Sequence, residues 1–274
     1  MKTLLILFVF CFPVFGQNDI NQYKKMLDQA LKMQESQNAS SGAMDIRIER
    51  IGGNVKVITS YEEEADLTDN YQYPLEAGDT IKTGYDGYAN IYINNIGVIR
   101  LERNTELEIT EPSNDMVFSL SLGSVVSKME SLNKSKMSLK IKTPSALVAV
   151  RGTEFAAEYS KFQDETSAAV FDEGEVFLYP GENEDETKAI KITKNSETSL
   201  TSSSKRVKVT KLSRFLKYKR SLTETKKNLI AHKKKWKKFD NEHRQKFREA
   251  LFKKNVGQTK QKKQNIKNTG TLKK

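Results

Sequence analysis

Cysteine is almost absent from this 274-residue chain, which contains Cys11 alone. A single thiol cannot form an internal disulfide, so a small disulfide-stapled fold is excluded. Histidine is also scarce, because only His232 and His243 are present and both lie near the C-terminal end. The region before residue 205 therefore has no imidazole for a zinc site or for a Ser-His-Asp arrangement. The sequence predicts no catalytic residue, no bound metal and no cofactor, and hence a protein that is not an enzyme.

Long hydrophobic runs are scarce as well. The longest, Leu4–Phe15, has 12 residues and ends beside the small residue Gly16. A membrane-spanning helix needs ~20 apolar residues, so this run is typical of a secretory signal peptide cleaved near Gly16. Lipid anchoring of Cys11 is less well supported, since bulky Phe10 precedes it where a lipoprotein has a small residue. The mature chain is predicted to be exported, to the periplasm or cell envelope.

Acidic residues become rare after Ser204. Residues 205–274 contain 26 Lys or Arg and 4 Asp or Glu, for a charge of 26 − 4 = +22. The whole chain has 46 basic and 35 acidic residues, so the first 204 residues contain 20 and 31, for a charge of −11. Such a basic tail either meets an anionic partner or lies on the acidic body of its own chain.

Between residues 44 and 204 the apolar residues alternate with polar ones in short runs. These runs are DIRIERI, NVKVI, ANIYIN, VIRLE, TELEI, VFSLSL, LKIKT, VFLY and AIKIT, and glycine, asparagine and aspartate separate them. Alternation places every second side chain on one face, as in half-buried strands. The pattern predicts an all-β domain over residues 44–204, of the sandwich, jelly-roll or barrel type. Residues 17–43 are predicted to form a short helix and a linker.

Two motifs in this β region resemble the FecR family. The first is LEAGDTIKTGYDGYANI from Leu75, and the second is KTPSALVAVRGTEF from Lys142, followed by Glu173–Val176. The positions that carry the resemblance are Gly78, Asp79, Thr83, Gly84, Gly87, Pro144, Arg151, Gly152, Thr153, Glu154, Phe155 and Gly174. The resemblance covers about residues 51–200.

The resemblance implies a mainly β, jelly-roll-like β-sandwich in the bacterial periplasm or envelope, without enzymatic activity and often associated with signalling. The founding members of the family relay a signal from an outer-membrane transporter to a sigma factor. That relay needs a cytosolic segment and a membrane-spanning helix before the domain. A signal peptide is predicted there instead, so a sigma-factor role is not expected from this sequence.

The second motif also has a physical interpretation of its own. Pro144 lacks an N–H, which suits the start of a strand. Val148 and Val150 are expected on one face of that strand and Arg151 on the other. The guanidinium of Arg151 can pair with Glu154 or Glu173, or it can bind a carboxylate ligand.

The basic tail has apolar residues at helical spacing from Leu212 to Phe252, which predicts a long amphipathic helix. Within it, the candidate residues for binding an anionic surface are Lys233, Lys234, Lys235, Trp236, Lys237, Lys238 and Phe239. Lysines beside aromatic residues suit anionic lipid or a cell-wall polymer. The helix can instead pack on the β-domain or self-associate, because Phe215, Leu222 and Leu229 recur every seven residues. Nucleic acid is excluded as a partner by export, and the chain beyond Gly257 is predicted to be disordered.

Two functions remain open at this point. The first is a non-catalytic exported envelope protein in which a FecR-like β-domain acts as a recognition or scaffold module and the basic tail docks on an anionic envelope component. The second is a periplasmic signal-transduction component that binds a protein partner through the edge of its sheet.

Overall fold

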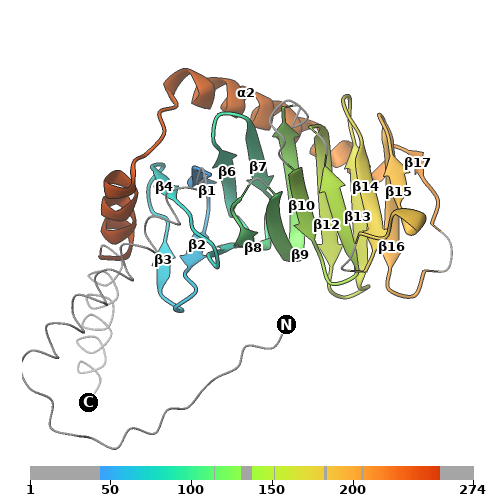
Figure 1. Ribbon diagram of the computed structural model, residues 1–274, viewed down its shortest axis with the longest axis horizontal. Helices are drawn as coiled ribbons and strands as arrows, with labels where there is room; N and C mark the ends of the chain where they lie inside the picture. Colours follow the sequence, from blue (N-terminus) through green and yellow to red (C-terminus); the bar gives the residue numbers. More distant parts are fainter. Residues whose placement is uncertain are drawn as a thin grey trace, which may run out of the picture. The chain divides into compact units, whose positions relative to one another are not determined.

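The structure, a computed structural model, describes residues 44–113, 115–130, 138–150, 152–181, 184–204 and 207–253. The predicted signal peptide (1–16), the predicted helix and linker (17–43), Arg151 and the predicted disordered end lie outside the described residues. The described part is mainly β with a helical C-terminal segment, which confirms the predicted fold class (Figure 1).

The strands form two sheets. Sheet A has the order β4 (Gln72–Pro74), β1 (Ile46–Gly52), β6 (Tyr88–Ile93), β7 (Gly97–Leu101), β9 (Asp115–Met129), β12 (Glu154–Ser160), β13 (Glu165–Val170), β16 (Ser196–Thr201) and β17 (Thr210–Lys211). Sheet B has the order β3 (Glu64–Asp66), β2 (Val55–Ile58), β5 (Thr80–Thr83), β8 (Glu106–Glu111), β9, β10 (Ser138–Lys142), β11 (Ala146–Val150), β14 (Val176–Pro180) and β15 (Ile190–Ile192).

Strand β9 belongs to both sheets. Its first half pairs with β8 and β10 in sheet B, and its second half pairs with β7 and β12 in sheet A. Gly123 stands where the strand passes from one sheet to the other and has a φ of +92°. A Cβ atom there would lie 2.6 Å from the carbonyl oxygen of Asn104, so this position requires glycine. The two sheets are therefore held together covalently at their centre.

Most hairpins alternate between the sheets. From β6 onward, β6–β7 lies in sheet A, β8–β9 and β10–β11 in sheet B, β12–β13 in sheet A, β14–β15 in sheet B and β16–β17 in sheet A. The strand pairings establish this order of hairpins, and they do not confirm the finer expectation of a jelly roll.

The core lies between the two sheets, and strand alternation produces it as predicted. Ile91 and Ile93 of β6 point inward with Phe118 of β9 and Phe155 of β12, and all four side chains are fully buried. Tyr92 and Val98 lie on the opposite, outer face of sheet A and are buried too. Another element must therefore cover that outer face.

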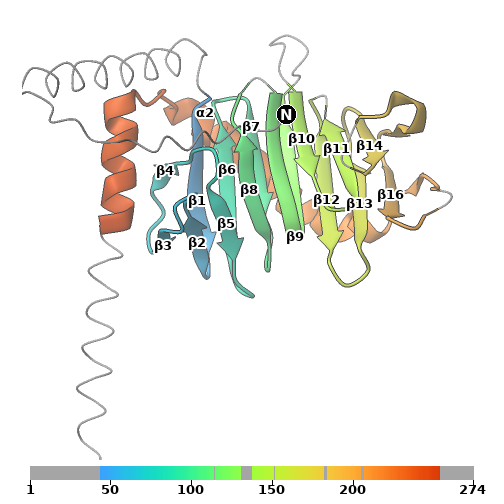
Figure 2. The ribbon, with the colours of Figure 1, turned by 60° about the horizontal axis from the view of Figure 1, so that its bottom comes forward.

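The C-terminal segment supplies this cover. It consists of the 3₁₀ helix η3 (Arg214–Tyr218), helix α2 (Lys219–Lys235), an extended link over 236–240 and helical residues 241–253. Helix α2 runs across the strands and contacts β7 and β9 (Figures 1 and 2). The tail is helical as predicted, but in two runs, because Trp236 is extended (ψ 130°) and the Asp240 carboxylate accepts the N–H of His243 at 2.8 Å as a new helix cap.

Candidate functional site

The outer face of sheet A carries the C-terminal segment through two apolar clusters. In the first, Phe215, Tyr218 and Leu222 pack on the small residues Val126, Ala156 and Ala169, with Phe171 beside them. In the second, Leu229 packs on Tyr92 and Val98. The seven-residue spacing of Phe215, Leu222 and Leu229 therefore serves packing on the chain's own β-domain, which was one of the alternatives open from the sequence.

Carboxylates on the same face bind the cations of the tail. Glu158 is bound by Arg214 at 2.5 Å, by Lys217 at 2.6 Å and by the hydroxyl of Tyr218. Burial alone would raise the pKa of Glu158, but the hydrogen bonds from Lys217 and Tyr218 and the charges of Lys217 and Arg214 outweigh it and hold that pKa below its usual value. The acidic body and the basic tail thus neutralise one another along this face.

The first FecR-like motif is placed at turns of the β1–β8 region. Asp79 is buried, and its carboxylate accepts the N–H of Glu76 at 2.8 Å. Thr83 donates its hydroxyl to the Glu102 carbonyl at 2.6 Å and accepts the N–H of Thr105 at 2.9 Å. The turn from Gly84 to Gly87 packs closely on the backbone of Asn54. Gly78, with a φ of +83°, completes the motif.

The second motif occupies turns and strands of the other half. Pro144 is exposed in the turn between β10 and β11. Phe155 enters the core, and Thr153 is buried with its hydroxyl donating to the Glu173 carbonyl. Gly174 has a φ of +84°, and a Cβ atom there would lie 2.5 Å from that of Thr153, so the turn requires glycine. Gly152 also has a positive φ, of +63°.

Each motif contributes one buried carboxylate that pairs with the C-terminal segment. Arg248 binds Asp79 through two nitrogens, at 2.6 and 3.1 Å. Lys226 binds Glu154 at 2.6 Å, and Lys128 binds the same carboxylate at 3.1 Å. Sequence reasoning missed both pairs, because the partners are separated by 169 and 72 positions in the chain. The alternation of Glu154, Ala156 and Glu158 on one strand face was the available signal.

The predicted binding segment, residues 233–239, is only partly free. Lys233 pairs with Glu130, and Trp236 is half-buried. The guanidinium of Arg47 lies over the Phe239 ring, 3.4 Å from its centroid, and the Phe247 ring stacks on Phe239 with centroids 5.2 Å apart. The exposed members are Lys234, Lys235, Lys237 and Lys238. Four of the five lysines of this segment thus remain accessible, whereas its aromatic side chains pack within the protein.

His232 anchors the end of α2. Its ring stacks on Tyr92 with centroids 4.3 Å apart, its Nε2–H donates to the Asn94 carbonyl at 2.8 Å, and its Nδ1 accepts from the Gln72 amide at 3.3 Å. Burial lowers the pKa of His232 below its ordinary value of 6.5, against the opposing effect of the Asn94 hydrogen bond. The neutral imidazole is therefore the form that fits this position.

Stability is expected to fall as the pH drops below 6.5. The unfolded chain takes up a proton on His232 at that pH, while the folded chain resists it, so stability present above 6.5 is lost as pH falls through the folded pKa. Urea unfolding midpoints measured from pH 7.5 to 5 should show this slope, and His232→Gln should flatten it. The matched control is His243→Gln at an exposed histidine, and an equal slope in both variants would contradict the assignment.

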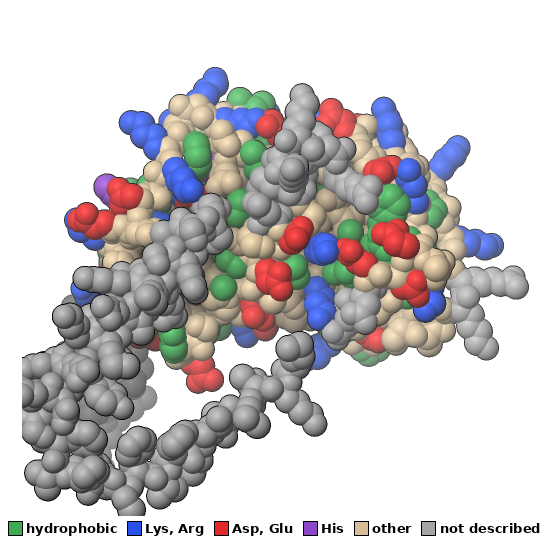
Figure 3. Space-filling model, in the orientation of Figure 1, with side chains coloured by type: hydrophobic (Ala, Val, Ile, Leu, Met, Phe, Trp, Pro, Cys, Tyr) green, Lys and Arg blue, Asp and Glu red, His purple; other side chains and the backbone are tan. Residues whose placement is uncertain are grey.

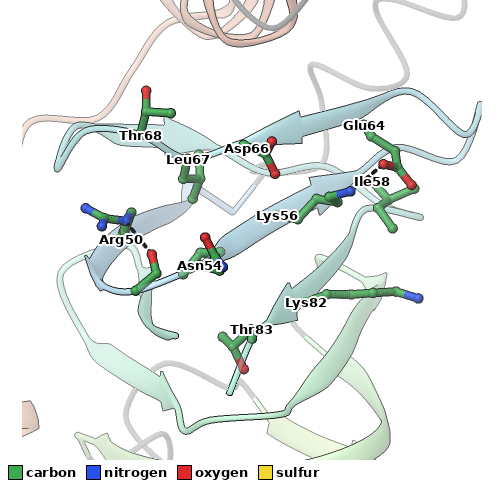
Figure 4. A pocket seen from close by; sticks show the side chains of 13 residues that line it. Arg50, Asn54, Lys56, Ile58, Glu64, Asp66, Leu67, Thr68, Lys82 and Thr83 are labelled. Carbon is green, nitrogen blue, oxygen red and sulfur yellow. Dashed lines mark hydrogen bonds and ion pairs between the residues drawn. The ribbon is translucent and has the colours of Figure 1, made fainter. Parts of the chain in front are cut away.

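Several surface hollows occur in the described part of the chain. One of them has a volume of about 760 Å³ and lies over β2, β3 and β5 (Figure 4). Its charged groups are engaged locally, since Lys56 pairs with Glu64 at 2.5 Å and Arg50 donates to the Gly53 carbonyl at 2.7 Å. Acidic and basic side chains are interspersed on the face seen in Figure 3. Among the described residues, no group of three or more His, Cys, Asp or Glu side chains could hold a metal ion.

Comparison with known proteins gives one family. The model for the family described as FecR protein matches residues 79–177. Two crystal structures of a protein from Parabacteroides distasonis ATCC 8503, provisionally described as an anti-sigma factor, are 12% and 14% identical, with a TM-score of 0.41 over 50% of this chain. This chain spans 61% of the length of each. No curated protein matches. Within the described ranges, no helix is long and apolar enough to cross a membrane.

Proposed function

Residues 79–177 give this chain a FecR-like domain, and from that premise we propose that it is a non-catalytic, envelope-associated component of signal transduction. In this proposal residues 1–16 direct export, residues 44–204 form the recognition module, and the tail from residue 205 stabilises the module and adds strand β17 to its sheet. The module binds a protein partner through the sheet borders formed by β15 and β17, which we name the open end. The observation that carries the proposal is the contrast between the two borders of sheet A.

The border at β4 is covered by the C-terminal helical residues. Arg248 donates to the Pro74 carbonyl at 3.2 Å, and Arg244 donates to the Leu75 carbonyl at 2.8 Å. Leu251 is buried in the main core, with Phe247 and Phe252 packed against it. A partner strand has no access to this border.

The open end is uncovered in the described part of the chain (Figure 1). Thr210 and Lys211 of β17 are both exposed, and so is Lys191 of β15. An exposed edge offers unpaired N–H and C=O groups to an extended segment, which is the usual basis of strand addition. A lysine at the centre of β15 discourages indiscriminate pairing, so that recognition depends on a complementary partner.

Docking of the tail on an anionic envelope component is the second candidate. Lys234, Lys235, Lys237 and Lys238 favour it, because they are exposed and make no ion pair with the described residues. Packing of Trp236 and Phe239 within the protein weakens it, since interfacial aromatics are then lacking. The charge alone would support binding that declines with salt.

One crosslinking experiment separates the two candidates. A photo-crosslinking amino acid is introduced in intact cells at Thr210 in one variant and at Lys234 in the other, both at exposed positions. We expect one stoichiometric protein adduct from Thr210 and none from Lys234. Lipid or glycan adducts from Lys234, without a protein adduct from Thr210, would instead support docking and contradict the proposal.

A further inference from the structure

A pocket lies at the open end, where three segments of the chain meet. It has a volume of about 490 Å³, within the ~300–1,000 Å³ range of ligand pockets. Its walls come from the β15–β16 turn, from β17 and the residue after it, and from η3 with the first residue of α2. Its charged and apolar lining consists of Lys194, Lys211, Lys219, Leu212 and Leu216.

Backbone hydrogen bonds hold these walls in place. The N–H of Leu212 donates to the Asn195 carbonyl at 2.9 Å, and the N–H of Asn195 donates to the Phe171 carbonyl at 2.8 Å. The carboxylate of Glu197 accepts three N–H groups at the start of η3, from Ser213 at 2.9 Å, Arg214 at 3.0 Å and Phe215 at 3.1 Å. The pocket is therefore built on fixed backbone, although its lysine side chains are exposed.

The charge of this pocket is of one sign. No aspartate or glutamate lines it, and its three lysines make no ion pair with the described residues. Other cations of the tail differ in this respect, because Lys217 and Lys226 bind Glu158 and Glu154 on sheet A. Three cations without a counter-charge repel one another, and an anionic ligand relieves that repulsion.

The pocket also has an apolar part. Leu212 is half-buried and Leu216 is 46% exposed, while the neighbouring Phe215 is buried against sheet A. The turn of η3 thus directs the Leu216 side chain outward, into the pocket that the three lysines line. A ligand that satisfies both parts has carboxylates beside an apolar side chain, whereas inorganic phosphate would leave the leucines in water.

We propose that this pocket binds an acidic, apolar peptide segment of the partner protein, laid along the exposed edge of β17. The inference rests on the proposed function and adds to it the chemistry of the partner. A peptide is favoured over lipid because the pocket adjoins a free strand edge, where the backbone of an extended segment finds hydrogen-bond partners. In an extended segment residues two positions apart share a face, so a carboxylate and an apolar side chain at that spacing would both reach the pocket.

The test uses the full mature chain and fluorescein-labelled octapeptides, with binding followed by fluorescence anisotropy. The probe repeats Glu-Ser-Leu-Ser, which places Glu and Leu on one face of an extended chain, and two reference peptides replace every Glu by Gln or every Leu by Ser. We expect both references to bind at least about tenfold more weakly. The variant Lys194→Gln/Lys211→Gln/Lys219→Gln should lose roughly tenfold in affinity for the Glu-Leu probe.

The matched control is Lys227→Gln/Lys234→Gln/Lys235→Gln, which removes three exposed lysines of α2 outside this pocket. Equal losses in both triple variants would overturn the pocket and indicate general charge attraction. If the protein bound phosphatidylglycerol vesicles more tightly than the peptide, and the pocket variant lost that vesicle binding, the peptide assignment would be overturned. A Thr210 crosslink to a partner that persists in the pocket variant would refute this inference and leave the proposed function standing.

Discussion

A chain that ends at Ser204 is expected to lose roughly 5 kcal/mol or more of its unfolding free energy. The truncation removes Phe215, Leu222 and Leu229, which are buried on sheet A. Each fully buried side chain of this size contributes ~1.5–3 kcal/mol, and domains of this kind are stable by only ~5–15 kcal/mol. Urea unfolding followed by far-UV circular dichroism would measure the loss of stability. Light scattering would detect aggregation through the apolar face that the truncation exposes.

The control distinguishes packing from charge. Leu222→Ala/Leu229→Ala keeps the tail and its cations and should lower stability by about 2–5 kcal/mol for each leucine. Lys227→Ala, at an exposed position on the same helix, should leave the unfolding midpoint unchanged. A truncated chain as stable as the full chain would show that α2 does not support the β-domain. Because truncation is expected to destabilise the body, point variants are the better test of tail binding.

Removal of the Asp79 carboxylate is expected to cost about 3–5 kcal/mol. The side chain of Asp79 is 2% exposed and that of Arg248 is 14% exposed. Asp79→Ala leaves the guanidinium of Arg248 without its bidentate partner in a buried place, and it also deprives the N–H of Glu76 of its acceptor. Thermal and urea unfolding would measure the effect.

A double-mutant cycle tests the pair itself. Arg248→Met should also destabilise the protein, and the variant with both changes should be more stable than the sum of the single effects implies, because the pair is lost only once. Glu242→Gln, which breaks an exposed pair with Lys246, should leave stability unchanged. Strict additivity of the two single changes would contradict a direct contribution of the pair.

The β-domain could be predicted from the sequence because its signals are local. Alternation in Ile91, Tyr92 and Ile93 predicts which side chains share a face, and each run of this kind contains a strand or part of one. The passage of β9 between two sheets was not predictable in this way. Its only local sign is Gly123, and a glycine signals a turn as readily as a crossing.

The tail was predicted as helical, but neither its interruption nor its location followed from spacing alone. Asp240, followed by Asn241 and Glu242, is a helix-start signal that could have indicated the second run. The pairs of Asp79 with Arg248 and of Glu154 with Lys226 depend on tertiary placement, which one sequence does not reveal. The charges of −11 on the first 204 residues and +22 on the tail are compatible with packing of the tail on its own β-domain and with binding of an external partner. The structure shows the tail packed on the β-domain.

The covered border at β4 limits how this molecule can associate. Of the two borders of sheet A in the described part of the chain, only β17 is open to extension, because Arg244, Arg248 and Leu251 close the border at β4. Two copies joined edge to edge at β17 would each end the shared sheet with a closed border, so growth of sheet A would stop at a pair. Runaway polymerisation into fibres, the usual hazard of an exposed strand, is thereby blocked along this sheet.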